Sequence, residues 1–184
     1  MAVELSYRDM SIAWHVAGLQ TLRAIKFATE GRNGQRYGGK FSASVIDERA
    51  DFAGALGEVA VAKAFNLWWT AVLDVGSGDV GDMVEVRAAF KRPRFGLCIH
   101  PDDEDDLPFV CVDLSCLPAV SLVGWDYARA CKNQEWWADP TGTGRPAFFK
   151  PPGLLRDCRE LKRICHQSLI AGTAPLLVPL GVRC

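Results

Sequence analysis

Near the start of the chain, apolar residues recur every three or four positions, which is the spacing of one face of an α-helix. Within residues 8–30 these positions are Ile12, Val16, Leu19, Leu22 and Ile25. A second helix is predicted over residues 42–66, because Ser42 or Ser44 can cap its first turn. The same helical spacing predicts a closing helix within residues 154–165.

The middle of the chain has short apolar runs separated by turn-forming residues, which are typical of β-strands. The expected strands are residues 67–73, 83–88, 96–100, 108–114, 119–125 and 145–150. A short helix is expected at residues 126–137. A chain of 184 residues is long enough to bury a hydrophobic core, so the pattern predicts one α+β domain. We expect its core over about residues 42–165 and a tail, packed over the core or disordered, over residues 166–184.

Composition and charge exclude several classes of protein. Hydrophobic residues make up 49% and charged residues 23% of the chain, which is ordinary for a soluble globular protein. The seven cysteines form no Cys-x-x-Cys pair, so we expect no zinc site and a reduced, cytoplasmic protein. Neither a basic-then-apolar leader nor an apolar run of the roughly 20 residues that span a bilayer is found, so no membrane partner is expected.

The strongest candidate for chemistry is the stretch 78–87, in which three acidic side chains and one arginine occur within ten residues. Asp79 and Asp82 lie in a glycine-punctuated turn. Glu85 and Arg87 are two apart on a predicted strand, so both point to the same face. Carboxylates beside a fixed cation suit a divalent metal and an anionic substrate, and oxygen ligands favour Mg²⁺ or Mn²⁺.

Glu58 is the second candidate, because its neighbours on the predicted helix face are small or apolar. They are Gly54, Ala55, Val61 and Ala62. Such a face can pack closely on a sheet, and close packing would justify the two glycines of this helix, which lower helix stability. A carboxylate carried inward by that packing needs a metal or a hydrogen-bond partner. The alternative is an ordinary solvent-facing glutamate.

Two basic loops are candidates for contact with nucleic-acid phosphates, because flexible backbone and cations together can hold a phosphate. They contain Arg32, Arg36 and Lys40, and Lys91, Arg92 and Arg94. Solvated linkers are the alternative. The acidic run 102–106 is most simply a solvated hairpin connection, from which His100 and Asp102 could approach the site.

The order of these features resembles the PD-(D/E)XK nuclease superfamily, and most of all its small uncharacterised phage-encoded members. Glu58 matches the helical acid of the family, Asp79 or Asp82 its aspartate, and Glu85 the acid of the strand pair, with Arg87 in the place of the lysine. The resemblance covers roughly residues 54–155. It implies a restriction-endonuclease-like fold, in which helices flank a mixed central β-sheet.

The resemblance also implies metal-dependent hydrolysis of phosphodiester bonds in the host cytoplasm, with Mg²⁺ or Mn²⁺ held by Glu58, Asp79 or Asp82, and Glu85. Arginine cannot give up a proton at ordinary pH, but it can hold a phosphate or stabilise developing charge. An inactive nuclease-like module that binds DNA or a host protein is therefore the first alternative. A surface ion pair of Glu85 and Arg87 on a domain of another function is the second, and homodimerisation is left open.

Overall fold

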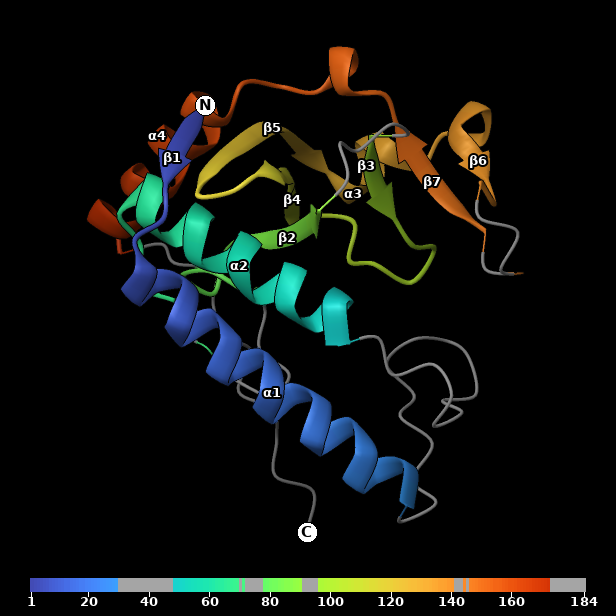
Figure 1. Ribbon diagram of the computed structural model, residues 1–184. Coiled ribbons are helices and arrows are strands. Elements are labelled where there is room, and N and C mark those ends of the chain that lie inside the picture. The colour runs from blue at the N-terminus through green and yellow to red at the C-terminus, as the bar shows by residue number, and fades with distance from the viewer. Residues whose placement is uncertain are drawn as a thin grey trace, which may run out of the picture.

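The computed structural model of the chain describes residues 1–29, 48–69, 71, 78–90, 96–140, 144 and 146–172 (Figure 1). The four helices are α1 (Tyr7–Thr29), α2 (Glu48–Phe65), α3 (Ala128–Cys131) and α4 (Cys158–Ile170) in these residues. The strands are β1 (Ala2–Glu4), β2 (Glu85–Ala89), β3 (Leu97–Ile99), β4 (Pro108–Cys116), β5 (Ala119–Tyr127), β6 (Trp137–Ala138) and β7 (Ala147–Lys150). Short 3-10 helices cover Gln134–Trp136 and Pro152–Leu154.

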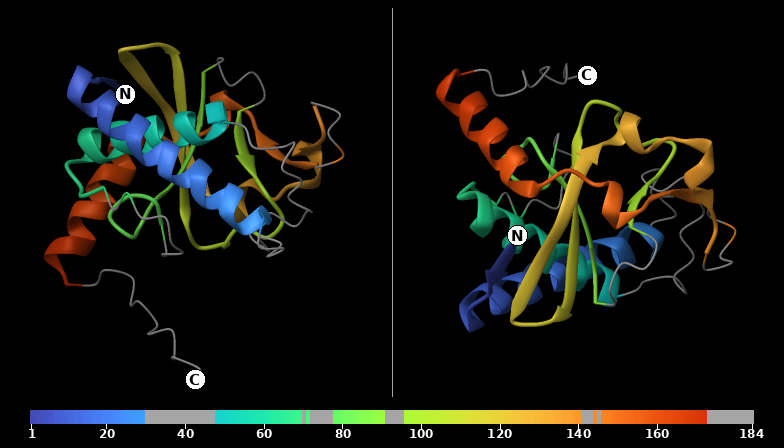
Figure 2. Two further views of the ribbon diagram at one scale, coloured as in Figure 1. Left: turned by 60° about the horizontal axis from the view of Figure 1, so that its bottom comes forward. Right: turned by 90° about the horizontal axis from the view of Figure 1, so that it is seen from above.

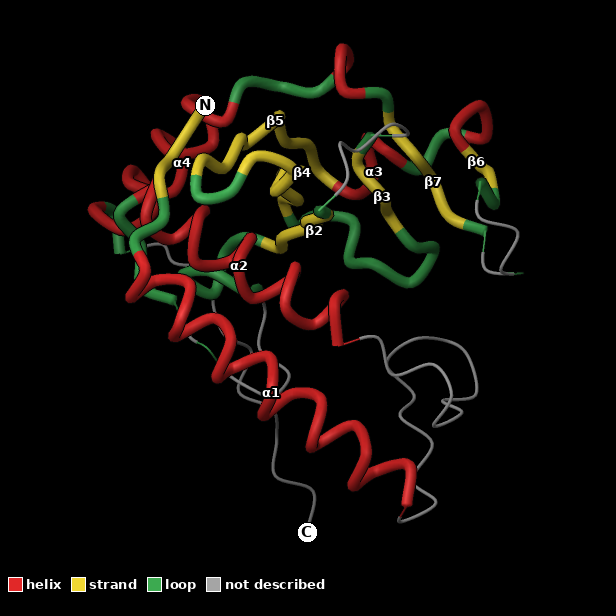
Figure 3. Tube along the Cα trace, viewed as in Figure 1, coloured by secondary structure: helices red, strands yellow, loops and turns green. Residues whose placement is uncertain are grey.

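The α+β prediction is confirmed, but the strands form two sheets in place of one central sheet. One sheet has the order β1-β5-β4-β2, and the other has the order β3-β7-β6 (Figure 3). All pairs are antiparallel except β2 with β4, which run parallel and place Glu85 beside Phe109 and Arg87 beside Cys111. β2 is the outer strand of the larger sheet, and the candidate stretch therefore lies at a sheet edge.

Two of the predicted elements differ from those in the structure for local reasons. In place of a strand at 67–73, the described residues show only an isolated bridge from Trp69 to Val80, because positive φ angles at Asn66 and Ala71 interrupt the extended chain. The helix expected at 126–137 is reduced to Ala128–Cys131, because β5 continues through Tyr127. The first six residues of the predicted helix 42–66 lie outside the described residues, as does most of the tail.

The long first helix is confirmed, but its buried face is not the predicted apolar stripe. Ala13, Ala17 and Thr21 face the protein interior, whereas Leu19 and Leu22 remain 53% and 63% exposed. Small residues on the inner face allow α1 to lie close to α2, and the hydroxyl of Thr21 donates to Asp51 of α2 at 2.7 Å. No helix in the described part of the chain is long and apolar enough to cross a membrane.

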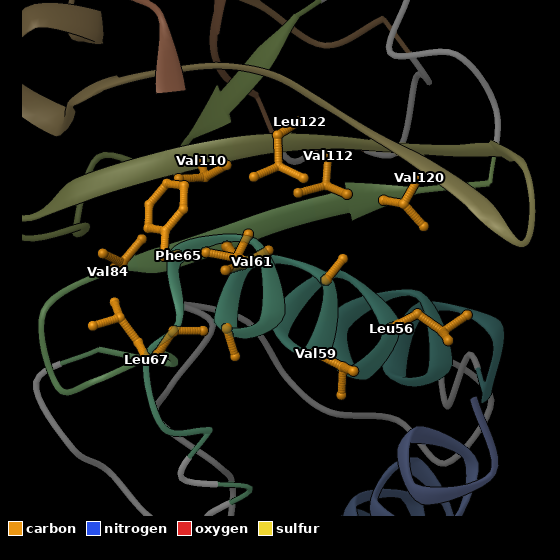
Figure 4. Packing of buried hydrophobic residues seen from close by; sticks show 14 of the residues in the cluster. Leu56, Val59, Val61, Phe65, Leu67, Val84, Val110, Val112, Val120 and Leu122 are labelled. Atoms are coloured by element: carbon orange, nitrogen blue, oxygen red, sulfur yellow. The ribbon is translucent and has the colours of Figure 1, made fainter. Parts of the chain in front are cut away.

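α2 lies directly on the larger sheet, with α1 packed on its outer side (Figure 1). Figure 4 shows Val61 and Phe65 of α2 near Val110 and Val112 of β4, and all four are fully buried. Gly57 is the point of closest approach. A Cβ atom at this position would lie 2.5 Å from the Cβ of Ala88 and 3.0 Å from the Cγ1 of Val86.

α4 holds the C-terminal end of α2 in place (Figure 2). Nζ of Lys162 donates to the carbonyl oxygen of Ala64 at 2.8 Å, and Nε2 of His166 lies 2.6 Å from the carbonyl oxygen of Phe65. These carbonyls belong to the last turn of α2 and have no partner within that helix. A cation at the negative end of the helix dipole also stabilises the helix, so α4 fixes the position of α2 on the sheet.

Replacing Gly57 with alanine tests the close approach of α2 to β2. The added methyl group would overlap Ala88, so we expect Gly57→Ala to lower the free energy of unfolding by about 1–3 kcal/mol. Gly54→Ala is the matched control, because a Cβ atom there meets only Oε1 of Glu58, at 3.8 Å. That control should be neutral or more stable, since alanine favours helix. Urea unfolding of both variants measures the difference, and equal stabilities would contradict the proposed packing.

Candidate functional site

The turn before β2 is built to present Asp79. Gly78 has a φ of +139°, and a Cβ atom there would lie 2.9 Å from the backbone nitrogens of Met83 and Val84, so only glycine fits. The backbone N–H of Val80 closes the turn on the carbonyl oxygen of Val84 at 3.1 Å. Oδ2 of Asp79 then accepts a hydrogen bond from the backbone N–H of Val86 at 2.9 Å. The carboxylate of Asp79 is thereby fixed against the outer edge of β2.

Glu85 and Arg87 point to the same face of β2, as predicted, and this face is opposite the one that contacts Gly57. The guanidinium carbon of Arg87 lies 4.7 Å from the centroid of the Phe109 ring on the neighbouring strand. Nη1 of Arg87 lies 3.4 Å from Oε2 of Glu85. Nη2 donates to both carboxylate oxygens of Asp103, at 2.9 and 3.1 Å. Arg87 is therefore held by two carboxylates and an aromatic ring.

Glu58 reaches the same region from α2. It follows Gly57 directly, so the close packing of α2 on β2 brings its side chain to the edge of the sheet. Nε1 of Trp69 donates to Oε2 of Glu58 at 2.8 Å. The inward-pointing glutamate predicted from its small neighbours is therefore half-buried and has a hydrogen-bond partner, as a buried carboxylate requires.

Burial and the negative charges of neighbouring carboxylates raise the pKa of both glutamates. The pKa of Glu58 rises from 4.5 to about 7, chiefly through burial and then through the nearby charge of Asp79, with a smaller contribution from Glu85. The pKa of Glu85 also rises to about 7, through burial and then Asp79, and Arg87 partly offsets the rise. Carboxyl groups that raise one another's pKa share a low-dielectric region, and each favours a cation or a proton there.

Glu58, Asp79 and Glu85 are neighbours but do not form a ready-made metal cage. Within the residues that the structure describes, no three His, Cys, Asp or Glu side chains are grouped closely enough to hold an ion. All three carboxylates accept hydrogen bonds from the protein itself, Glu58 from Trp69, Asp79 from the backbone N–H of Val86, and Glu85 from Arg87. The donor set fits a hard divalent cation in chemistry, but the side chains would have to move before three of them could bind one ion.

The structure distinguishes between the two aspartates of the turn. Asp79 affects the pKa of both glutamates, whereas Asp82 is not among the charges that do so. Asp82 has a φ of +55° in the same turn. The six residues of the two predicted basic loops, at 32–40 and 91–94, lie outside the described residues.

Two residues of this region were not predicted from the sequence. The acidic run 102–106 does reach the site, but through Asp103, whereas Asp102 is exposed. It is not a hairpin connection, because β3 pairs with β7 and β4 pairs with β2 and β5. Trp69, which donates to Glu58, is the second residue that the sequence does not predict for this site. Five consecutive acids and a tandem tryptophan are visible signals, but neither shows which member points inward.

The cysteines of the described residues are free, and most are buried, in agreement with a structural role. Burial raises the pKa of Cys98 to about 11 and that of Cys111 to about 12. A thiol with a raised pKa is a poor nucleophile and a poor metal ligand at neutral pH. At neutral pH, Cys98 and Cys111 are therefore expected to remain protonated.

Comparisons with known proteins leave the resemblance to the PD-(D/E)XK superfamily as a hypothesis. No family model, no curated protein and no solved structure matches the chain. The interpretation of the site therefore depends on its own geometry and chemistry.

The raised pKa of Glu58 predicts a pH-dependent stability. Glutamates of the unfolded chain titrate near the usual value of 4.5 and Glu58 of the folded protein at about 7, so the folded state binds more protons between these values. Stability should fall as the pH rises through this window. We expect Glu58→Gln to be about 1–3 kcal/mol more stable than the parent at pH 8, with the difference shrinking toward pH 5. Glu104→Gln, at an exposed position, is the control. Thermal unfolding across this pH range measures both, and a Glu58→Gln variant that is less stable at pH 8 would contradict the burial of a charged group.

Proposed function

We propose that this protein is a metal-dependent nuclease that hydrolyses phosphodiester bonds of nucleic acid, most simply DNA. The observation that carries the proposal is the meeting of Glu58, Asp79 and Glu85 from a helix, a turn and a strand beside Arg87. These are the acids on which the resemblance to the PD-(D/E)XK superfamily depends. An ordinary surface pair of Glu85 and Arg87 would not require two further half-buried carboxylates next to it.

The three carboxylates would hold Mg²⁺ or Mn²⁺, because both ions take oxygen ligands. A bound ion of this kind polarises a phosphate oxygen and lowers the pKa of its water. The chain's own contribution is to orient the ligands. Val86 holds Asp79 through its backbone N–H, and Trp69 holds Glu58 through its indole N–H. Arg87 supplies positive charge on the same face of β2 as Glu85.

A phosphodiester is an anion, and the site alone carries more negative than positive charge. Within the described residues, the charges of Asp103, Glu85 and Asp79 act on the guanidinium group of Arg87, and Glu58 is close enough to Asp79 and Glu85 to be affected by their charges. Repulsion of the substrate is therefore expected unless a divalent cation is bound. This balance supports a metal requirement for binding as well as for catalysis.

Incubation of the protein with plasmid and linear DNA in Mg²⁺, Mn²⁺ or EDTA tests the proposal. We expect cutting only with the metal ions, and its loss in Glu85→Ala by more than the roughly 10- to 100-fold that removal of an outer-shell partner costs. Glu104→Gln, which removes an exposed charge and none of the three proposed ligands, should still cut. Equal cutting by Glu85→Ala, or cutting in EDTA, would show that a different site or a contaminant is responsible.

Trp69 provides a second test, because it orients Glu58 without being a ligand. Trp69→Phe keeps an aromatic ring but removes the N–H that donates to Oε2 of Glu58. We expect roughly 10-fold weaker binding of Mn²⁺, measured by isothermal titration calorimetry. Trp68→Phe is the matched control, since the neighbouring Trp68 is 48% exposed. If the two variants bind Mn²⁺ equally, Trp69 does not position a ligand.

The second candidate function is an inactive nuclease-like module that binds DNA or a host protein. The contact that favours it is the one between Arg87 and Asp103, because an arginine already paired with a carboxylate is less able to stabilise a transition state. DNA binding without cutting under every metal, and no change in unfolding temperature with Mg²⁺ or Mn²⁺, would favour this alternative.

A further inference from the structure

Arg87 supplies positive charge to the part of the candidate site that the structure describes, and its guanidinium group is already hydrogen-bonded to Asp103. The two oxygens of Asp103 lie 2.9 and 3.1 Å from Nη2 of Arg87, and the side chains of Arg87 and Asp103 are only 28% and 15% exposed. Nη1 of the same guanidinium group lies near Oε2 of Glu85, and the group stacks over the ring of Phe109. A phosphate oxygen that approaches Nη2 would therefore meet a carboxylate in its place.

The turn that carries Asp103 is fixed by bonds that do not involve Arg87. The carboxylate of Asp103 also accepts from the backbone N–H of His100 at 2.8 Å, and its carbonyl oxygen accepts from Nζ of Lys132 at 2.6 Å. The backbone N–H of Arg129 donates to the carbonyl oxygen of Asp105 at 3.1 Å, which joins the turn to α3. Asp103 is therefore held at its position by the scaffold. Release of the pair would have to come from rotation of the Arg87 side chain.

We propose that Asp103 is a built-in competitor of anionic ligands for Arg87, so that a phosphate group binds Arg87 only after the Arg87 side chain has turned away from the Asp103 carboxylate. This regulation of the site rests on the proposed function, in which Arg87 faces a phosphodiester. A carboxylate and a phosphate offer a guanidinium group the same kind of charged acceptor oxygens, so one can replace the other. The contact with Asp103 weakens the binding of any anion to Arg87. A ligand must therefore make further contacts, or bind together with a metal ion, to offset this loss.

The acidic turn offers a matched pair of variants. Asp103→Asn and Asp102→Asn each remove one negative charge from adjacent residues, so the long-range attraction for an anion changes equally in both. Only Asp103→Asn weakens the contact with Arg87, and asparagine can still accept from the N–H of His100. A difference between the two variants therefore measures competition and not overall charge.

Two probes distinguish this inference from the proposed nuclease activity. One is a short fluorescein-labelled DNA duplex in Ca²⁺, followed by anisotropy, and the other is inorganic pyrophosphate in Ca²⁺, followed by calorimetry. We expect Asp103→Asn to bind both roughly 10-fold tighter than Asp102→Asn, as loss of a competing charged hydrogen bond implies. The gain should disappear in Arg87→Gln/Asp103→Asn. Equal binding by the two asparagine variants, weaker binding by Asp103→Asn, or no binding of either probe by it would overturn the proposal.

If the wild-type protein cuts no DNA, the nuclease proposal is wrong. The inference that Asp103 competes for Arg87 would still hold if Asp103→Asn binds pyrophosphate more tightly than Asp102→Asn. Should Asp103→Asn fail to fold, nuclear magnetic resonance on the unchanged protein gives the answer. Binding of the DNA duplex should then shift the Arg87 Nε–Hε and His100 backbone N–H signals with one dissociation constant. Saturation with DNA that leaves the Arg87 signal unmoved would contradict the competition.

Discussion

The candidate site depends on the close approach of α2 to the outer strand of the larger sheet. Gly57 permits this approach, because any side chain there would overlap Ala88 and Val86. The next residue is Glu58, so the contact that buries the helix also carries a carboxylate to the sheet edge. Lys162 and His166 of α4 contact the carbonyl oxygens of the last turn of the same helix. A displacement of α2 would move Glu58 away from Asp79 and Glu85, and it would also disturb the core, to which Leu56, Val61 and Phe65 of this helix belong.

The close placement of Glu58, Asp79 and Glu85 lowers the stability of the folded protein at neutral pH. Burial and the charge of Asp79 raise the pKa of Glu58 and Glu85 to about 7, so at neutral pH the folded protein either retains protons or bears like charges close together. A chain selected only for stability would place an uncharged side chain at one of these positions. Partly buried groups that raise one another's pKa are characteristic of functional sites, although ion-pair networks can do the same. The raised pKa values thus agree with a site for a cation, and they are independent of any resemblance to a known family.

The sequence predicted local features well and distant ones poorly. The helical face of Glu58, its small neighbours and the two-residue spacing of Glu85 and Arg87 are set by helix and strand geometry, and the structure agrees with all three. Asp103 meets Arg87 across sixteen positions, and the fold of the turn after β3 decides which acid of the run points inward. The inner face of α1 was also unpredictable, because Ala13 and Ala17 are buried by close contact with α2 while larger apolar residues stay outside. Division of the strands into two sheets depends on pairing partners, which alternation of apolar residues does not specify.

Arg87 is best understood together with Asp103 and Phe109. A lysine ammonium group is a compact charge that can lose its proton when buried, whereas a guanidinium group keeps its charge, stacks on a ring and meets both oxygens of a carboxylate. Arg87 uses each of these abilities, since it lies over Phe109 and contacts both oxygens of Asp103. The pair contributes little net charge while it is intact, and it would leave a buried arginine or a buried aspartate if only one partner were lost. Positions 87 and 103 therefore act as one unit, and whether that unit separates when an anion arrives is the physical difference between a catalytic site and a binding module.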